Sequence, residues 1–300
     1  MGAFQAVEAS YNIQYHRWGR EQTKGSGVFG DVRPCTHQRT HALRAVKSIE
    51  KVDWGTRGRV LEEIRLLQTV GRKHPNVIEY VEYYEEWGVM NLIFEYCAKG
   101  SLGDLMELNK PPSEGVAASY LSQLLSALAF LEDLEILHRD VKPDNLLLKD
   151  ELTLKLADFG SGCFCTQPLR HAEGTPSFWA PEQHLLPRGK GYSFPVDTWA
   201  TGVTMYMLLF NGRHPFEDKG AISRQLIFRG QIDVGWLTSS GASDLLRWLL
   251  MPNANQRIAT KDAQGHPWFH THGVGHGTFA KQRPKPLVLD SYGNWHQTRD

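Results

Sequence analysis

The segment 136–148, ILHRDVKPDNLLL, contains many side chains that could take part in chemistry. Two apolar pieces enclose a loop that carries His, Arg, Lys, Asn and two Asp residues. A loop that only connects two elements is usually built from residues such as Gly, Ser and Asn. Charged groups between two segments that favour burial indicate functional groups on a rigid scaffold. The sequence therefore predicts a loop whose polar groups are held in fixed positions for chemistry.

A second chemical pattern is the glycine-rich stretch GSGVFGDV, in which Gly25, Gly27 and Gly30 have the spacing G-x-G-x-x-G. Glycines let backbone amides approach phosphate oxygens without interference from a Cβ atom. The same spacing occurs in dinucleotide-binding units, where a helix follows directly, but here DVRPC continues as a strand. A glycine-rich hairpin is a further alternative. The spacing alone leaves these three interpretations open.

Lys47 ends the apolar strand pattern RAVK and needs an anionic partner there. Glu63 lies on or near the apolar face of the helix predicted downstream, with helical spacing to Leu67. Glu62 is the adjacent alternative, and two solvated charges without a fixed contact are another. We predict the pair Lys47–Glu63.

The elements that must position these groups follow from periodicity. Segments 27–35 and 40–50 are predicted strands, and 77–97 is predicted to form two strands around a turn at Trp87-Gly88. A helix is predicted over 57–70, with Val60, Leu61, Ile64, Leu67 and Val70 on its apolar face. Helical patterns follow at 116–134 after Pro112-Ser113, at 195–210 and at 242–250. Strands followed by helices predict an α+β chain with two lobes, joined near residues 95–101.

Composition limits the class of partner. The chain has 300 residues, 41% of them hydrophobic, which is enough for one large domain or two lobes. Lys+Arg and Asp+Glu number 33 each, so no global charge favours nucleic acid or an anionic membrane. The longest strongly apolar run, 203–210, is less than half of a bilayer span, so no transmembrane segment is predicted. Partners must be selected by a local site.

The cellular location is predicted from what the sequence lacks. We find neither a secretory signal pattern nor an N-glycosylation sequon. Cys35, Cys97, Cys163 and Cys165 are too few to staple a domain of this size and lack paired metal spacing. We expect reduced surface or packing thiols and an intracellular location, cytoplasmic or nuclear.

HRDVKPDN at 138–145 resembles the catalytic loop of eukaryotic protein kinases. Downstream, ADFG at 157–160 and APE at 180–182 resemble that family's metal-binding and activation-segment motifs, and the glycine loop and AVK lysine precede them in the family's order. The resemblance covers roughly residues 18–270. It implies a two-lobed protein kinase fold with an N-terminal extension (1–17), an N-lobe with hinge (18–97), a C-lobe (98–270) and a C-terminal tail (271–300).

The resemblance implies transfer of the γ-phosphoryl group of ATP, with Mg²⁺, to serine or threonine hydroxyls of protein substrates. Lys47 would hold the α- and β-phosphates, Asp158 and Asn145 would bind the metal, and Asp140 would orient the hydroxyl and accept its proton. Lys142, which would contact the γ-phosphate, matches the serine/threonine form of the loop. The groove threonine, Thr175, would help to position Asp140 and Lys142. The implied nucleotide contacts are Gly25, Ser26, Gly27, Gly30, Val32, Ala45, Lys47, Phe94, Glu95, Cys97 and Leu147.

Supporting positions agree with this resemblance. Phe94 would be the gatekeeper behind adenine, and Glu95 and Cys97 would offer hinge backbone groups. Asp197 would be the buried carboxylate that braces the catalytic loop. Arg257 would pair with Glu182, and a buried ion pair of this kind marks a fixed architecture.

Three positions depart from the family pattern. Lys24 stands where an apolar residue usually covers adenine, although its alkyl stem could substitute. His171 occupies the place of an activating phosphothreonine, while Arg139, which would receive that phosphate, is present; we therefore expect activity without phosphorylation there, with Thr166 or Ser161 as weaker candidate sites. Ser101 replaces an acidic residue just after the hinge, which leaves Asp144 to recognise a basic residue in the substrate.

Other interpretations remain. A pseudokinase-type nucleotide-binding scaffold is the main alternative function, although Lys47, Asp140 and Asp158 are all present. His266, His270, His272 and His276 have a spacing that could be taken for a metal site, but HPWF at 266–269 resembles a terminal helix motif of calmodulin-dependent-type kinases. No basic patch supports nucleic-acid binding.

Overall fold

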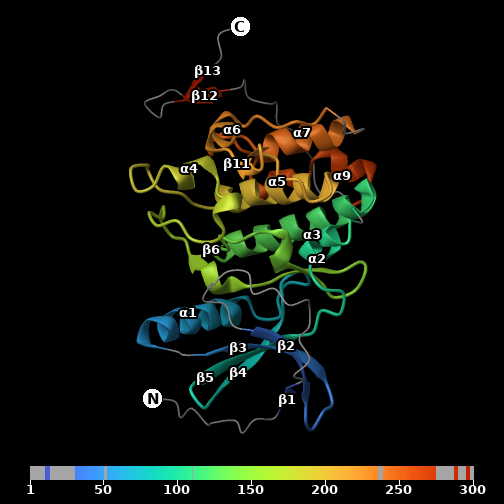
Figure 1. The fold of residues 1–300 in the computed structure, drawn as a ribbon, viewed down its shortest axis with the longest axis vertical. Coiled ribbons are helices and arrows are strands. Elements are labelled where there is room, and N and C mark those ends of the chain that lie inside the picture. The colour runs from blue at the N-terminus through green and yellow to red at the C-terminus, as the bar shows by residue number, and fades with distance from the viewer. Residues whose placement is uncertain are drawn as a thin grey trace.

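The chain folds into two lobes in a computed structural model that describes residues 11–13, 31–50, 53–109, 111–235, 239–274, 287–289 and 295–297 (Figure 1). The smaller lobe contains a five-stranded antiparallel sheet and one helix. The larger lobe is mainly helical. This arrangement confirms the predicted α+β fold with two lobes.

The sheet of the smaller lobe has the strand order β1-β2-β3-β5-β4. Its strands are β1 (Tyr11–Ile13), β2 (Asp31–His37), β3 (Leu43–Ile49), β4 (Tyr80–Glu86) and β5 (Val89–Glu95). Strand β3 lies in the centre, where Lys47 is opposite Val32 on β2 and Leu92 on β5. Strand β1 was not predicted, because a three-residue alternation is too short a pattern to identify a strand.

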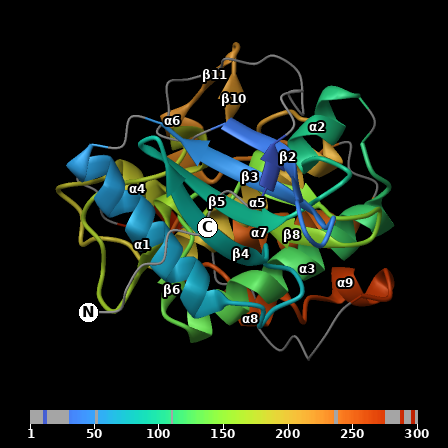
Figure 2. The same cartoon turned by 90° about the horizontal axis from the view of Figure 1, so that it is seen from below.

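Helix α1 (Trp54–Val70) packs against the sheet (Figure 2). It begins three residues earlier than predicted, because the Asp53 carboxylate caps it by accepting a hydrogen bond from the Thr56 N–H. Leu61 was wrongly predicted to lie on the buried face and is 40% exposed. At 100° per residue it falls on the flank of the helix, and Leu66 is buried instead.

Helix α3 (Glu114–Asp133) forms the centre of the larger lobe. Its first turn is capped by Ser113, as predicted, and it packs against α5 (Pro195–Leu209). Among the described residues, α3 is the one helix long and apolar enough to cross a membrane, and most of it is buried in this core. The remaining helices are α2 (Leu102–Glu107), α4 (Pro181–His184), α6 (Arg224–Arg229), α7 (Ser240–Leu249), α8 (Thr260–Ala263) and α9 (Pro267–Thr271).

Short strands and 3-10 turns of the larger lobe flank the loops that face the smaller lobe. Strand β6 (Ile136–Leu137) pairs with β9 (Cys163–Phe164), and β7 (Leu146–Leu148) pairs with β8 (Leu154–Leu156). The 3-10 turns η1 (Pro143–Asn145), η2 (Phe159–Ser161) and η3 (Pro176–Phe178) lie between or after these strands. Two further antiparallel strand pairs are β10 (Glu217–Asp218) with β11 (Ala221–Ile222) and β12 (Leu287–Leu289) with β13 (Trp295–Gln297).

The ion pair between Arg257 and Glu182 ties α4 to the core of the larger lobe. The Arg257 guanidinium donates to both Glu182 oxygens at 2.7 and 3.0 Å. It also donates to the carbonyl oxygens of Pro195, Met251 and Pro252. A buried guanidinium with this many acceptors leaves several unpaired oxygens when it is removed.

We therefore expect Arg257→Leu to lower the free energy of unfolding by about 3–5 kcal/mol, measured by urea denaturation. The matched control is Lys261→Met, which removes the exposed ion pair with Asp133 and should lower the free energy of unfolding far less. Equal losses in the two variants would contradict the role of Arg257 in the core.

Candidate active site

The loop between β6 and β7 is held by the carboxylate of Asp197 in α5. The backbone N–H groups of His138 and Arg139 donate to the two oxygens of this carboxylate at 2.8 and 2.9 Å. Asp197 is only 5% exposed, and a buried charge needs such donors to be stable. Helix α5 thereby fixes the backbone immediately before Asp140.

Asp140 lies at the centre of a dense hydrogen-bond network. The Thr175 N–H and hydroxyl donate to Asp140 Oδ1 at 2.8 and 2.7 Å. Lys142 Nζ lies 3.0 Å from Asp140 Oδ2 and donates to Thr175 Oγ1 at 2.7 Å. Burial opposes ionisation of Asp140, but Lys142 and Thr175 outweigh it and hold the pKa of the carboxyl below its usual value. The group is therefore an ionised acceptor at neutral pH.

Asn145 belongs to the same network and orients Asp140 from the other side. Its amide nitrogen donates to the Asp140 carbonyl oxygen at 2.8 Å and to Asp140 Oδ2 at 3.0 Å. Because the nitrogen is used in this way, the amide oxygen of Asn145 is directed elsewhere. Asn145 lines the pocket between the lobes.

Gly174 brings the segment containing Thr175 against the catalytic loop. Its φ is +85°, which favours glycine, and a Cβ atom there would lie 2.1 Å from the Arg139 carbonyl oxygen. No side chain fits in that space. The close approach of two backbones is what places Thr175 on Asp140.

Lys47 connects the sheet of the smaller lobe to α1 and to the larger lobe. Its Nζ lies 2.8 Å from Glu63 Oε1 and 2.9 Å from Asp158 Oδ1. Burial would lower the pKa of Lys47, but Asp158 and Glu63 outweigh burial and raise it. Glu62, the alternative partner, is half-buried, and its carboxylate lies 3.6 Å from Arg65 Nη1. The predicted contact Lys47–Glu63 is confirmed.

Asp158 faces the pocket because the next residue is anchored in the core. Phe159 is buried, and its ring centroid lies 5.0 Å from that of His138. Asp158 has a φ of +61°, which turns its carboxylate back toward Lys47. Helix α1 also contacts η2 and β9, so the position of this segment depends on both lobes.

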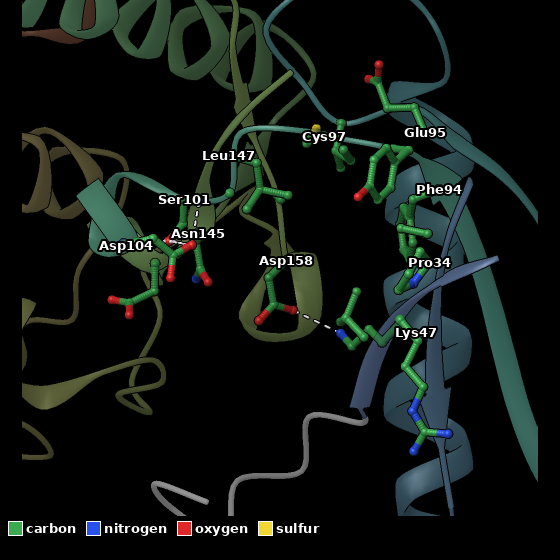
Figure 3. Close-up of a pocket in the computed structure, with 18 of the residues that line it drawn as sticks. Pro34, Lys47, Phe94, Glu95, Cys97, Ser101, Asp104, Asn145, Leu147 and Asp158 are labelled. Atoms are coloured by element: carbon green, nitrogen blue, oxygen red, sulfur yellow. Dashed lines mark hydrogen bonds and ion pairs between the residues drawn. The ribbon is translucent and has the colours of Figure 1, made fainter. Parts of the chain in front are cut away.

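A pocket of about 290 Å³ lies between the lobes (Figure 3). Figure 3 shows Leu147 and Asp158 on one side of it and Pro34, Phe94 and Lys47 on the other. The structure brings together these predicted contacts: Val32, Ala45, Lys47, Phe94, Glu95, Cys97, Asn145, Leu147 and Asp158. The other predicted contacts, Gly25, Ser26, Gly27 and Gly30, lie outside the described residues, as does Lys24.

The hinge after β5 is attached to the larger lobe. The Glu95 side chain points away from the pocket in Figure 3 and binds Lys155 at 2.6 Å and Lys149 at 2.9 Å. The backbone N–H of Lys99 donates to the Leu148 carbonyl oxygen at 3.0 Å. The hinge therefore presents backbone groups, and not the Glu95 carboxylate, to the pocket.

Sequence reasoning missed the role of Asp104 beside the pocket. Its Oδ2 accepts hydrogen bonds from the Ser101 N–H at 2.8 Å and hydroxyl at 3.0 Å, while Ser101 Oγ accepts from the Asp104 N–H. This capping box starts α2. The spacing Ser-x-x-Asp was the signal that could have identified it.

The cysteines are free thiols, and His266 caps a helix. Burial raises the pKa of the Cys97 thiol to about 12 and that of Cys165 to about 11, so both are protonated at neutral pH. His266 caps α9 and lies 3.1 Å from Asp244. No group of three or more His, Cys, Asp or Glu residues that could hold a metal occurs in the part of the chain that the structure describes. His276 lies outside it.

This arrangement of a two-lobed fold, an interlobe pocket and a Lys–Glu–Asp cluster facing an oriented carboxylate defines the protein kinase class. Residues 18–269 match the family "Protein kinase domain", and the chain belongs to this family. Its relatives include proteins named serine/threonine-protein kinases.

One relative is serine/threonine-protein kinase DCLK3 from Mus musculus, 36% identical over 264 residues. The match covers 84% of this chain and 32% of that protein. Phosphorylase b kinase gamma catalytic chain, liver/testis isoform, from Homo sapiens is 32% identical over 273 residues, with 85% and 67% covered. Serine/threonine-protein kinase DCLK1 from Rattus norvegicus is 33% identical over 265 residues, with 84% and 60% covered. The match thus spans from about one third to two thirds of these relatives.

The close approach at Gly174 can be tested by Gly174→Ala. We expect phosphoryl transfer to fall by about 100-fold or more, because the added Cβ displaces Thr175 from Asp140. Gly220→Ala is the matched control, since Gly220 has a similar φ of +80° and open space around it. Activity of folded Gly174→Ala equal to that of the control would contradict this explanation.

A second test concerns His184, the last residue of α4. Its ring is 5.6 Å from that of Trp179 and 6.3 Å from that of Phe228. Burial, reinforced by Arg224, lowers the pKa of His184 to about 4. In the unfolded chain the pKa of His184 is about 6.5. Between pH 6.5 and pH 4, the unfolded chain therefore binds more protons at this residue than the folded protein does.

The His184 contribution to stability should therefore decrease as pH falls from about 6.5 to about 4. We measure the free energy of unfolding in urea at pH 7 and at pH 5. The decrease between these two pH values should be smaller for His184→Gln than for the wild type. The variant His270→Gln serves as the control, because His270 is exposed. An unchanged pH dependence in His184→Gln would show that His184 is not responsible.

Proposed function

We propose that this chain transfers the γ-phosphoryl group of ATP, in the presence of Mg²⁺, to serine and threonine hydroxyls of protein substrates. The observation that carries the proposal is the placement of two charged pairs. Lys47 and Asp158 pair with each other at the wall of the pocket. Asp140 pairs with Lys142 and is hydrogen-bonded to Asn145, which also lines the pocket. A pseudokinase that had lost transfer would be expected to lack one of these groups or their contacts. The names of the relatives support the same type of acceptor.

The residues would divide the work of phosphoryl transfer as follows. Lys47, held by Glu63, would neutralise phosphate charge at the pocket wall. Asp140, ionised and fixed by Thr175 and Asn145, would orient the attacking hydroxyl and accept its proton. Lys142, next to Asp140, would neutralise charge on the group in transfer.

The pocket also fits a magnesium ion that arrives with a nucleotide. Mg²⁺ prefers oxygen ligands and usually combines one or two carboxylates with substrate phosphates and water. Asp158 uses one carboxylate oxygen for Lys47, and Asn145 uses its amide nitrogen for Asp140. Asp158 and Asn145 would therefore offer their remaining oxygens, and bound Mg²⁺ would neutralise charge between the phosphates.

The acceptors would be proteins inside the cell. The four cysteines are free thiols, which supports a reducing, intracellular location in the cytoplasm or nucleus. Asp144 lines the pocket edge near Ser101 and Asp104, which supports recognition of a basic residue in the substrate.

The proposal is tested with labelled ATP, Mg²⁺ and a serine/threonine peptide library. We expect Asp140→Asn to reduce transfer by at least about 100-fold while ATP binding remains, because the amide cannot accept the proton. Asp218→Asn in the exposed hairpin β10–β11 is the control and should retain full activity. A wild-type protein that binds ATP but transfers no phosphate would favour the nucleotide-binding scaffold instead.

A further inference from the structure

Three positive charges lie beside the segment that leads to Thr175. Arg170, Arg188 and Lys190 are all exposed, and together we call them the basic patch. None of the three forms an ion pair or a side-chain hydrogen bond with another residue that the structure describes. Their charges are therefore available to a group from outside this part of the chain.

Backbone pairing brings the patch together from two segments. Leu169 and Tyr192 form an antiparallel bridge with hydrogen bonds of 2.8 and 3.0 Å. In an antiparallel pair the residue after one partner lies opposite the residue before the other, which places Arg170 opposite Gly191 and one position from Lys190. A Cβ atom on Gly191 would lie 2.8 Å from the Leu169 carbonyl oxygen, so the close approach requires glycine.

Acidic residues are scarce around the patch. Residues 164–172 and 183–196 contain no Asp or Glu. Two acidic residues lie between these segments, and the Glu182 carboxylate is bound by Arg257 at 2.7 and 3.0 Å. Glu173 alone is left to balance three cations. Because the whole chain has a formal net charge of zero, this excess is local.

The patch is close to the place where an acceptor hydroxyl would bind. Thr175 contacts Asp140 and follows Arg170 by five residues. Five residues span at most about 18 Å of fully extended chain. An extended substrate segment covers the same distance with about five residues of its own. A substrate side chain within about five positions of the acceptor can therefore reach the patch.

We infer that the basic patch binds an anionic side chain of the protein substrate, a carboxylate or a phosphate, close to the acceptor hydroxyl. The inference rests on the proposed function and deepens it by naming the chemical class of the substrate. Arginine and lysine bind both anions through charge-assisted hydrogen bonds, and a phosphate carries more charge than a carboxylate. With Asp144 at the pocket edge, the patch would select a substrate segment that carries both signs of charge.

The first test measures peptide phosphorylation by phosphatase-treated protein from which the phosphatase has been removed. The serine peptides carry glutamine, glutamate or phosphoserine at one position, placed in turn within about five residues on either side of the acceptor. At the best position we expect KM to be about three- to tenfold lower for an anionic peptide than for the glutamine peptide, because exposed ion pairs contribute modestly.

The three peptide series distinguish the sources of the anion. A lower KM with both anions supports an acidic substrate, and a lower KM with phosphoserine alone supports a substrate phosphorylated beforehand. Equal KM values for the three side chains at every position would overturn the inference.

The patch variant Arg170→Gln/Arg188→Gln/Lys190→Gln removes the three charges. We expect its KM for the anionic peptides to rise to that for the glutamine peptide, while kcat at saturating peptide changes less than about twofold, because the patch would bind the substrate and touch no reacting atom. An anion preference that persists in the patch variant would overturn the inference.

The matched control is Arg39→Gln/Arg59→Gln/Arg247→Gln. These three arginines are also exposed, and their removal changes the net charge by the same amount. The control variant should keep the preference for anionic peptides. Loss of the preference in both variants would show that the overall charge, and not the patch, is responsible.

Ionic strength gives a readout that a purely structural defect would not move. From about 50 to about 300 mM NaCl, KM for the phosphoserine peptide should rise several-fold in the wild type and in the control variant, because salt screens exposed charges. The same KM should change little in the patch variant. An equal salt dependence in all three proteins would contradict binding at the patch.

Peptide binding without ATP separates this inference from the proposed function. Fluorescence anisotropy of a labelled phosphoserine peptide gives Kd without phosphoryl transfer, and we expect the patch variant to bind at least about threefold more weakly than the wild type and the control variant. Weaker binding together with a silent transfer assay in every protein would count against the proposed function alone. Equal Kd values in the three proteins would overturn the inference even if the wild type were an active kinase.

Discussion

The structure depends most on one buried carboxylate, that of Asp197 in α5. An ionised group in the core is stable only with strong hydrogen-bond donors, and both donors here are backbone N–H groups of the catalytic loop. Backbone donors fix the path of a chain more firmly than mobile side chains do. Because these donors belong to His138 and Arg139, the position of Asp140 follows from the position of α5. Arg139 accepts an uncommon φ of +67° to remain there.

A second constraint joins the two lobes through charge. Lys47 comes from the central strand, Glu63 from α1 and Asp158 from the loop after β8, so one buried ammonium group links three elements. Removing any member would leave buried charge without compensation. The geometry of the pocket is therefore a property of both lobes together. Helix α1 transmits this dependence, because it packs on the sheet and also contacts the segment after Asp158.

Much of this could be predicted from local patterns. The two strands around Trp87-Gly88, the cap at Ser113 and the choice of Glu63 over Glu62 depend on spacing within a few residues. The missed features depend on contacts between distant segments. Gly174 is required by the Arg139 backbone, and the Tyr192 hydroxyl reaches a carbonyl oxygen 21 positions away. Neither the register of these segments nor the outward direction of Glu95 is contained in hydrophobic periodicity.

The attachment of the hinge has a mechanical consequence. Glu95 is bound to Lys149 and Lys155, and Lys99 is bound to Leu148, so the linker and the hairpin β7–β8 behave as one body. The backbone of Ile78 adds a further tie by donating to the Leu156 carbonyl oxygen at 2.9 Å. The covalent connection between the lobes is therefore not the pivot between them. If the sheet rotates relative to the helices, the strands β4 and β5 must twist, because the linker after β5 is fixed to the larger lobe.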